Sequence, residues 1–448
     1  MPAACPRASR ATHEGGTPVY LSTIDHPHAG DDTPTPSRRK ALFLLTGNVF
    51  ALGAVSLVTD ISSEMMTAIL PVYLVVGLHL SPAVYGVVDG TYTGATALLR
   101  LVGGYIADST RRRKLIAGLG YGLSAVAKLG LLAAGSAVGA IGAVIAIDRT
   151  GKGLRTAPRD ALITLSTPQQ LYGRAFGVHR TMDTIGAFTG PLVALGILAA
   201  TAQSYDAVFV ASFCIAAFGV LILVLFVRDH HDEQPPTGTI SPSALGGLIA
   251  MAPVRRLVLA ACLAGMVTIG DGFVYLLLQH REHLSVSWFP LLAVGTNLSY
   301  LLLATPLGML ADKIGRLKVV LVGYTALVLV YLLLFGPFGG TALLLMVLAL
   351  YGLFYAATDG ILMALAGPVL PESLRTTGIA LIQTGQALSY LVSSVMFGLA
   401  WTVWGPADAS RVAAVLVAVA VLVIGLLLRG IPATNTAGSA GDVAEEHA

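Results

Sequence analysis

The chain has 448 residues, of which 55% are hydrophobic and 11% are charged, and its formal net charge is +3. A soluble domain carries about 25% charged residues, and a soluble protein of this size has no interior large enough to hide so much apolar surface. The composition therefore excludes an ordinary soluble protein and predicts one surrounded by membrane lipid. The small net charge gives no reason to expect nucleic acid as a partner. Three scattered cysteines predict neither a disulfide framework nor a metal site.

The two ends of the chain differ from the rest. Residues 1–40 are polar and rich in Pro, Gly, Thr and Asp, without the apolar run of a signal peptide. We interpret them as a disordered cytoplasmic tail, and residues 430–448 as a second one.

Between the tails, apolar stretches of about 20 residues, the length that crosses a bilayer, recur along the chain. The fold class expected is an all-α membrane protein with twelve transmembrane helices in two pseudo-symmetric six-helix bundles, at 41–228 and 254–429, joined by a cytoplasmic linker at 229–253. The predicted spans are 48–74, 82–107, 115–135, 138–162, 172–200, 205–227, 254–278, 287–311, 317–336, 341–366, 375–402 and 411–429.

The basic residues predict the orientation. The stretch from Ala41 to Leu80 is long enough for two spans. As one span it places nearly every loop Lys and Arg on the same side, leaving only Arg281 and Arg411 opposite. That asymmetry predicts cytoplasmic termini in a multi-pass protein of the plasma (inner) membrane.

The two halves are related in sequence. Residues 104–114 (GYIADSTRRRK) align with 308–318 (GMLADKIGRLK) at a constant offset of 204, and Asp60 aligns with Asp271. Duplicated halves around a pseudo-axis are typical of transporters, which bind substrate near the midplane.

The repeated turn resembles the signature of the major facilitator superfamily. The second copy fits fully, whereas the first has Ser109 in place of a basic residue and Arg111 in place of Gly. Residues 149–153 (RTGKG) resemble a further motif of the superfamily, and 186–196 (GAFTGPLVALG) resemble the Gly/Pro motif of its proton-coupled antiporters. The resemblance covers 41–429 and implies a bacterial, antiporter-like transporter.

The repeated turns suggest a conformational gate. Their acidic residues suit helix starts, and their basic residues suit acids on neighbouring helices, so such contacts would hold one arrangement of the halves and break in another. The alternative is that the basic residues only fix the topology. The gate residues are Gly104, Asp108, Arg112, Lys114, Gly308, Asp312, Gly315, Arg316 and Lys318.

Charged residues inside the spans are functional candidates because burial in the bilayer is costly. Asp60 and Glu64 are spaced i,i+4 and share a face, which suits proton binding. The candidates for proton coupling are Asp60, Glu64, Asp89, Arg149 and Asp183.

The predicted fourth span carries a charged stripe. At 100° per residue, the side chains of Asp148, Lys152, Arg155 and Arg159 lie within a narrow sector, which predicts that they line the central cavity or pack on charged neighbours. The alternative is a closed network of structural ion pairs, and an anionic substrate is possible only if part of the stripe is unpaired. Further polar residues are candidates for the substrate path, or for interhelical hydrogen bonding instead: Asp271, Asn297, Tyr300, Asp359, Gln383, Gln386 and Tyr390.

These features predict a secondary active transporter that moves a small organic solute by alternating access. Proton-coupled export is the first expectation and uptake by proton symport the second. A multi-spanning membrane transferase and a transport-inactive sensor are the alternatives of other classes. We expect a monomer with H⁺ and a small-molecule substrate as partners, no cofactor, no metal and no enzymatic activity.

Overall fold

The computed structural model describes residues 47–110, 112–168, 171–229, 242–359, 365–366, 369–371 and 375–429. The predicted tails at 1–40 and 430–448 lie outside these residues, as do linker residues 230–241. The described chain is helical throughout and contains no strand.

The first half forms six long helices whose ends agree with the predicted spans to within a few residues. α2 continues into a short π-helical turn, η1, and the side chain of Ser204 caps α7 by accepting a hydrogen bond from the N–H of Ala207 at 3.3 Å. The elements are α2 (Gly47–Val72), η1 (Tyr73–Gly77), α3 (Pro82–Thr110), α4 (Arg113–Ala134), α5 (Val138–Leu165), α6 (Tyr172–Ala200) and α7 (Tyr205–Phe226).

The second half repeats this arrangement with two interruptions. It follows a short helix, α8 (Pro242–Ala250), which lies inside the segment predicted to be linker. Its elements are α9 (Ala252–Val267), α10 (Asp271–Glu282), η3 (Val286–Trp288), α11 (Phe289–Ile314), α12 (Arg316–Phe335), α13 (Gly340–Thr358), α15 (Arg375–Trp404) and α16 (Pro406–Leu428).

The predicted span at 254–278 falls within Ala252–Glu282, which is long and apolar enough to cross a membrane. Its helix is interrupted, because α9 ends at Val267 and α10 begins at Asp271. Backbone groups released by a helix break in a membrane need partners from the protein. Here the N–H of Ile269 donates to the hydroxyl of Tyr331 at 2.8 Å, and its carbonyl accepts from Tyr351 at 3.1 Å. Within the predicted span at 341–366, α13 ends at Thr358, and residues 360–364 lie outside the described part of the chain.

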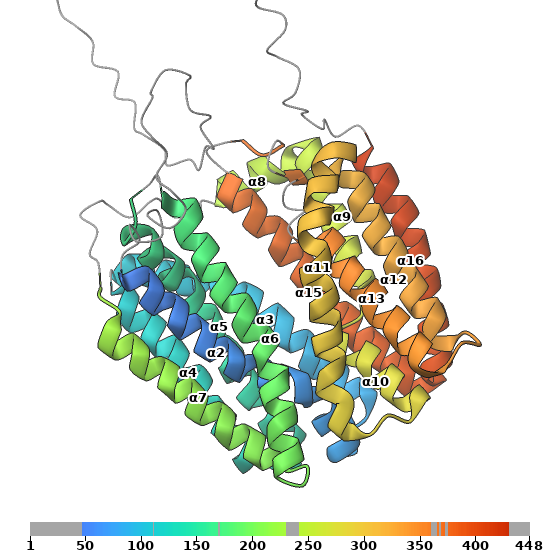
Figure 1. The fold of residues 1–448 in the computed structure, drawn as a ribbon. Helices are drawn as coiled ribbons and strands as arrows, with labels where there is room; N and C mark the ends of the chain where they lie inside the picture. Colours follow the sequence, from blue (N-terminus) through green and yellow to red (C-terminus); the bar gives the residue numbers. More distant parts are fainter. Residues whose placement is uncertain are drawn as a thin grey trace, which may run out of the picture.

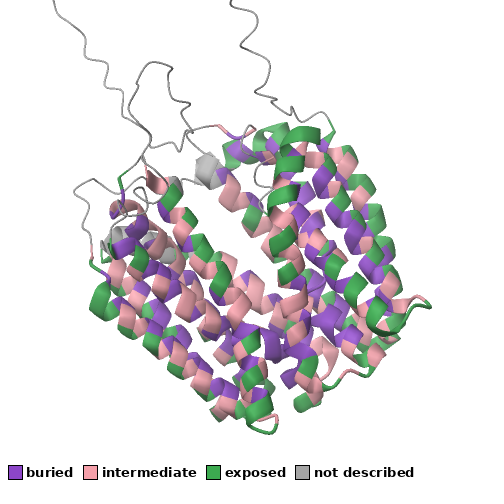
Figure 2. Ribbon diagram, in the orientation of Figure 1, coloured by how far each residue is buried: buried purple, intermediate pink, exposed green. Residues whose placement is uncertain are grey.

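The outer surface suits lipid. Ten helical segments in the described part of the chain are long and apolar enough to cross a membrane. α3 and α5, with 29 and 28 residues, are of similar length but are not among these ten. Large apolar side chains are exposed, for example those of Leu302 and Leu422, and exposed residues recur along the helices (Figure 2). The fold class is confirmed, and the number of twelve crossings stays a prediction.

The halves meet most closely at the end of the molecule where α10 lies, and their ribbons diverge toward α8 (Figure 1). Glycines spaced four apart on α3 allow α15 to approach. A methyl group at Gly90 would lie 2.8 Å from the carbonyl oxygen of Leu391, and one at Gly94 would lie 2.7 Å from the side chain of the same leucine. Small residues permit such close contact between membrane helices. We call this contact of α3 with α15 the closed end.

Candidate functional site

A cavity of about 340 Å³ lies between the two halves. Its charged side chains all come from α2, α5 and α6 of the first half, whereas α11 of the second half contributes uncharged ones. The lining residues are Asp60, Glu64, Lys152, Arg155, Thr156, Arg159, Asp160, Arg180, Asp183, Thr184, Ala187, Phe188, Asn297, Tyr300 and Leu301.

Two carboxylates occupy successive turns of α2 in this cavity, as their i,i+4 spacing predicts. The glycines of the antiporter-like motif on α6 lie against these turns. A methyl group at Gly186 would lie 3.1 Å from the Cβ of Asp60, and one at Gly190 would lie 2.8 Å from the Cβ of Glu64. The motif therefore packs on the part of α2 that carries both acids.

Arg155 faces these acids from α5 with its hydrogen-bonding capacity largely unused. The side chain is 3% exposed, and its Nη2 lies 3.9 Å from Oδ1 of Asp60. The guanidinium lies over the ring of Tyr121, 4.6 Å from the ring centroid. In the described part of the chain Arg155 makes no hydrogen bond, and its buried Nη1 has no partner.

Arg159, one turn further along α5, has partners. Its Nε donates to Oδ1 of Asp160 at 3.0 Å, and its Nη1 donates to the hydroxyl of Ser56 at 3.1 Å. Asp183 on α6 lies 3.4 Å from Nδ1 of His179. Its Oδ1 is buried, and no described group is bonded to it.

The structure splits the predicted stripe of α5. Lys152, Arg155 and Arg159 line the cavity, but Asp148 turns toward α4. There Asp148 accepts a hydrogen bond from Ser124 and lies 3.5 Å from Nζ of Lys128.

Arg149 shares this location outside the cavity lining. Its Nε donates to Oδ2 of Asp148 at 2.9 Å, and its guanidinium lies 3.5 Å from the ring centroid of Tyr92. Asp148 and Arg149 thus form a bonded ion pair on α5, which contacts Lys128 of α4 and Tyr92 of α3.

Asp89 belongs to the closed end. Its Oδ2 accepts hydrogen bonds across the two halves from the hydroxyls of Tyr390 at 2.9 Å and Ser394 at 2.7 Å, both on α15. The hydroxyl of Tyr85 lies 3.4 Å from Oδ1. The hydrogen bond between Asp89 and Tyr390 thus joins a predicted proton-coupling residue to a predicted substrate-path residue. Neither residue lines the cavity.

The remaining substrate-path candidates are distributed over the second half. Asn297 and Tyr300 line the cavity, and the hydroxyl of Tyr300 donates to Asp359 at 3.0 Å. Asp271 begins α10 directly after the helix break and accepts hydrogen bonds from Tyr351 and Tyr355. Gln383 and Gln386 lie on α15 outside the cavity lining.

The gate motif occupies equivalent positions in the two halves. Gly104 and Asp108 fall in the last turns of α3, as Gly308 and Asp312 fall in those of α11. The side chains of residues 103–111 lie outside the described part. Arg112 and Lys114 flank the start of α4, and Arg316 and Lys318 lie at the start of α12.

The second copy of the motif is described in full. Arg316 lies 3.7 Å from Asp312, and Gly315 has a φ of 101°. This backbone conformation favours glycine. In the first copy, Nζ of Lys114 donates to the carbonyl of Val224 at 2.9 Å.

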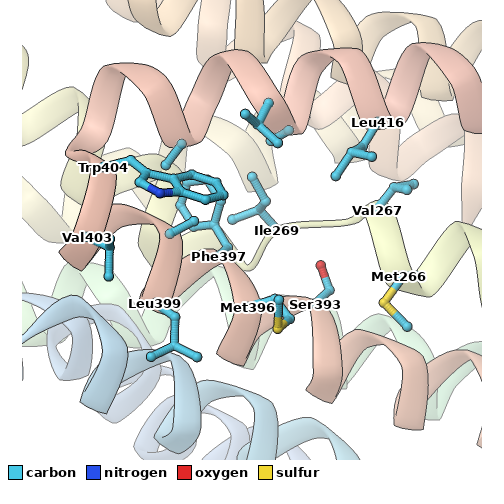
Figure 3. A pocket seen from close by; sticks show the side chains of 14 residues that line it. Met266, Val267, Ile269, Ser393, Met396, Phe397, Leu399, Val403, Trp404 and Leu416 are labelled. Atoms are coloured by element: carbon cyan, nitrogen blue, oxygen red, sulfur yellow. The ribbon is translucent and has the colours of Figure 1, made fainter.

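A second cavity of about 420 Å³ lies between α9, α15 and α16. Figure 3 shows that apolar side chains surround this cavity, with Trp404 at one end and Met266 at the other. Ser393 contributes a hydroxyl group to the lining. Its lining contains no charged residue, so it offers no site for an ionic solute.

The comparisons with known proteins identify the family. The model of the Major Facilitator Superfamily matches residues 52–296 and 281–446. The chain belongs to this superfamily. It is 31% identical over 369 residues to an uncharacterised MFS-type transporter of Methanocaldococcus jannaschii. The aligned residues cover 80% of this chain and 89% of that protein.

Solved structures share the fold of this MFS chain. The nucleoside transporter NupG matches with a TM-score of 0.74 and 16% identity, over 85% of this chain and 100% of NupG. A bacterial homologue of the human lysosomal transporter Spinster, in an inward-facing and occupied conformation, matches with a TM-score of 0.66 and 17% identity, over 85% of this chain and 96% of that one. The family and the fold make this chain a membrane transporter of small molecules and not an enzyme.

The sequence did not predict several residues of the cavity between the halves and of the closed end. Tyr121, which supports Arg155, and Phe188, which lines the cavity, carry no charge and match no motif that would distinguish them from ordinary core residues. Ser394 was missed for the same reason. Within the described residues, no group of three His, Cys, Asp or Glu side chains is arranged to hold a metal ion.

Proposed function

We propose that this protein is a proton-coupled secondary transporter that exports a small organic solute across the plasma membrane. In this proposal the end that carries α8 is cytoplasmic, and the halves rock about the cavity between them. The repeated turns at α3–α4 and α11–α12 act as the conformational gate.

Asp60 and Glu64 are the groups that bind the coupling proton. The observation that carries the assignment is their position, because both carboxylates line the cavity between the halves and both lie on turns that Gly186 and Gly190 contact. Rocking of the two halves would change the surroundings of both acids in the cavity between them, and a change of surroundings alters how readily a carboxyl group binds a proton.

A second candidate function is uptake by proton symport. The contact between Asp60 and Arg155 favours it, because a proton on Asp60 would release the guanidinium to a solute. Proton and solute would then bind together and travel in the same direction.

The test is a transport assay with the full-length protein in lipid vesicles that contain a pH-sensitive dye. Gradients of anionic, cationic and neutral organic solutes are imposed in turn. Export by antiport predicts proton movement opposite to the solute, and symport predicts movement in the same direction. Asp60→Asn and Glu64→Gln should abolish solute-driven proton movement, and Asp408→Asn, which alters an exposed acid, should not. Proton movement at the wild-type rate in both cavity variants would overturn the assignment.

A further inference from the structure

Two buried arginines on α5 differ in their hydrogen bonds and in their position relative to the cavity. Arg149 and Arg155 are 2% and 3% exposed, and each guanidinium lies over a tyrosine ring. Arg149 donates from Nε and Nη2 to Asp148. Arg155 makes no hydrogen bond to any described residue, although it lines the cavity. A guanidinium carries five N–H donors, and leaving buried donors unpaired is costly.

Lys152, one turn earlier on α5, adds a second unbonded cation to the same cavity. It lines the cavity together with Asp60 and Glu64, but in the described part of the chain it forms no ion pair with either acid. Lys152 and Arg155 therefore offer donors to one region of the lining. Among the described residues, Asp148, Arg155 and Arg159 of the charged stripe each have an ion-pair partner, and Lys152 has none.

The other acids of the cavity lining do not take up the donors of Lys152 and Arg155. Asp160 is bonded to Arg159, and Asp183 lies beside His179. Arg180 adds a further positive charge at the cavity wall. The acids that face Lys152 and Arg155 are Asp60 and Glu64, and neither forms a hydrogen bond with a described residue.

The remaining wall of the cavity suits an organic group. Phe188 of α6 and Leu301 and Tyr300 of α11 supply apolar and aromatic surface, and Asn297 supplies an amide. Ligand sites combine such apolar surface with a few polar groups that fix orientation.

We infer that the cavity binds a small organic anion, whose oxyanion group is bound by Arg155 and Lys152. The planar guanidinium matches the geometry of a carboxylate, phosphate or sulfonate with two parallel hydrogen bonds. The anion restores the partners that the buried guanidinium lacks. This inference rests on the proposed transport function and names its substrate class.

The experiment measures thermal unfolding of the purified full-length protein with benzenesulfonate, with the neutral benzenesulfonamide, and with sulfate. A ligand that binds the folded protein stabilises it in proportion to its saturation of the site. Benzenesulfonate should raise the unfolding temperature in a saturable manner, and benzenesulfonamide should not. Stabilisation by sulfate alone would show that the oxyanion is sufficient.

Variants locate the binding. Arg155→Gln should weaken benzenesulfonate binding by about tenfold to a hundredfold, the range expected for hydrogen bonds to a charged group. Arg155→Lys and Lys152→Gln should weaken it less, and they keep the test decisive if Arg155→Gln fails to fold. Arg149→Lys is the matched control, because Arg149 is equally buried and lies outside the cavity lining, and it should bind as the wild type does.

Two results would overturn the inference. One is the absence of stabilisation by every anion in the wild type, and the other is equal stabilisation in the Arg155 and Arg149 variants. The vesicle assay separates this failure from that of the proposed function. Transport of cationic or neutral solutes without anion binding would refute the substrate class alone. Anion binding without flux of any solute would refute the transport proposal and leave the site intact.

Discussion

Gly190 of α6 lies against Glu64 of α2 so closely that a methyl group on the glycine would lie 2.8 Å from the Cβ of the glutamate. The same methyl group would lie 2.7 Å from the carbonyl oxygen of Ile61. Backbone and Cβ atoms of α2, which make these contacts, have little room to adjust. The position of the Glu64 carboxylate in the cavity therefore depends on the absence of a side chain on α6.

Gly190→Ala should lower the stability of the protein, because overpacking a close contact costs about 1–3 kcal/mol. It should also reduce solute-driven proton movement by displacing α2. The measurements are the unfolding temperature and the vesicle assay. Gly196→Ala is the control, since no atom lies within 4 Å of a methyl group at this position of the same helix. Equal effects of the two substitutions would contradict the explanation.

The turn between α11 and α12 provides a second comparison of two glycines. Gly315 has a φ of 101°, whereas a methyl group at helical Gly308 would contact nothing within 4 Å. Gly315→Ala should therefore destabilise the protein by about 1 kcal/mol or more. Gly308→Ala should be neutral or stabilising, because alanine favours a helix by about 1 kcal/mol over glycine. Thermal unfolding of both variants checks this, and a less stable Gly308→Ala protein would contradict it.

Acid should strengthen the binding of benzenesulfonate, which stays ionised throughout the accessible pH range. The carboxylate of Asp60 lies 3.9 Å from Arg155 and competes with an anion for the guanidinium. A proton on Asp60 removes this competitor, so affinity should rise severalfold as the pH falls through the titration of that group. This result would favour the symport candidate, in which proton and solute bind together. Thermal unfolding titrations at several pH values measure the effect.

The Asp60→Asn variant tests the cause of that pH dependence. It should bind benzenesulfonate with the high affinity of the acidic wild type at all pH values, because its side chain has no charge to lose. A pH dependence identical to that of the wild type would assign the effect to another group in the lining, such as Glu64.

The helix boundaries could be predicted because a span needs about 20 apolar residues and polar turns separate the spans. The break at Thr268–Gly270 could not. Its residues are compatible with a continuous span, and the groups that stabilise the broken backbone, Tyr331 and Tyr351, come from α12 and α13. A break of this kind depends on tertiary contacts that no local pattern contains.

The candidate site divides in the same way. Helical periodicity places Asp148 and Arg155 on one sector of α5, and it correctly places Arg155 with Lys152 in the cavity lining. It misplaces Asp148, because the aspartate is drawn to its neighbour Arg149 and to Lys128 on α4. Periodicity gives the direction of a side chain, but the partners on the next helix decide where its charge is satisfied.

The tie at Asp89 predicts how the closed end opens. Asp89 accepts hydrogen bonds from Tyr390 and Ser394 across the two halves, and a hydrogen bond to a charged group contributes about 1.5–3 kcal/mol. Asp89→Asn and Tyr390→Phe should each shift the population toward a state in which this end is open.

Spin labels at Ser136 and Phe338 measure that shift in a background without the native cysteines. Both residues are exposed and lie in the corresponding loops α4–α5 and α12–α13. The distance distribution between the labels should gain a longer component in Asp89→Asn and in Tyr390→Phe. Tyr300→Phe removes a hydroxyl–carboxylate bond within the second half only, so its distribution should match the wild type. A wild-type distribution in both closed-end variants would show that the glycine contacts of α3, and not this tie, hold the end closed.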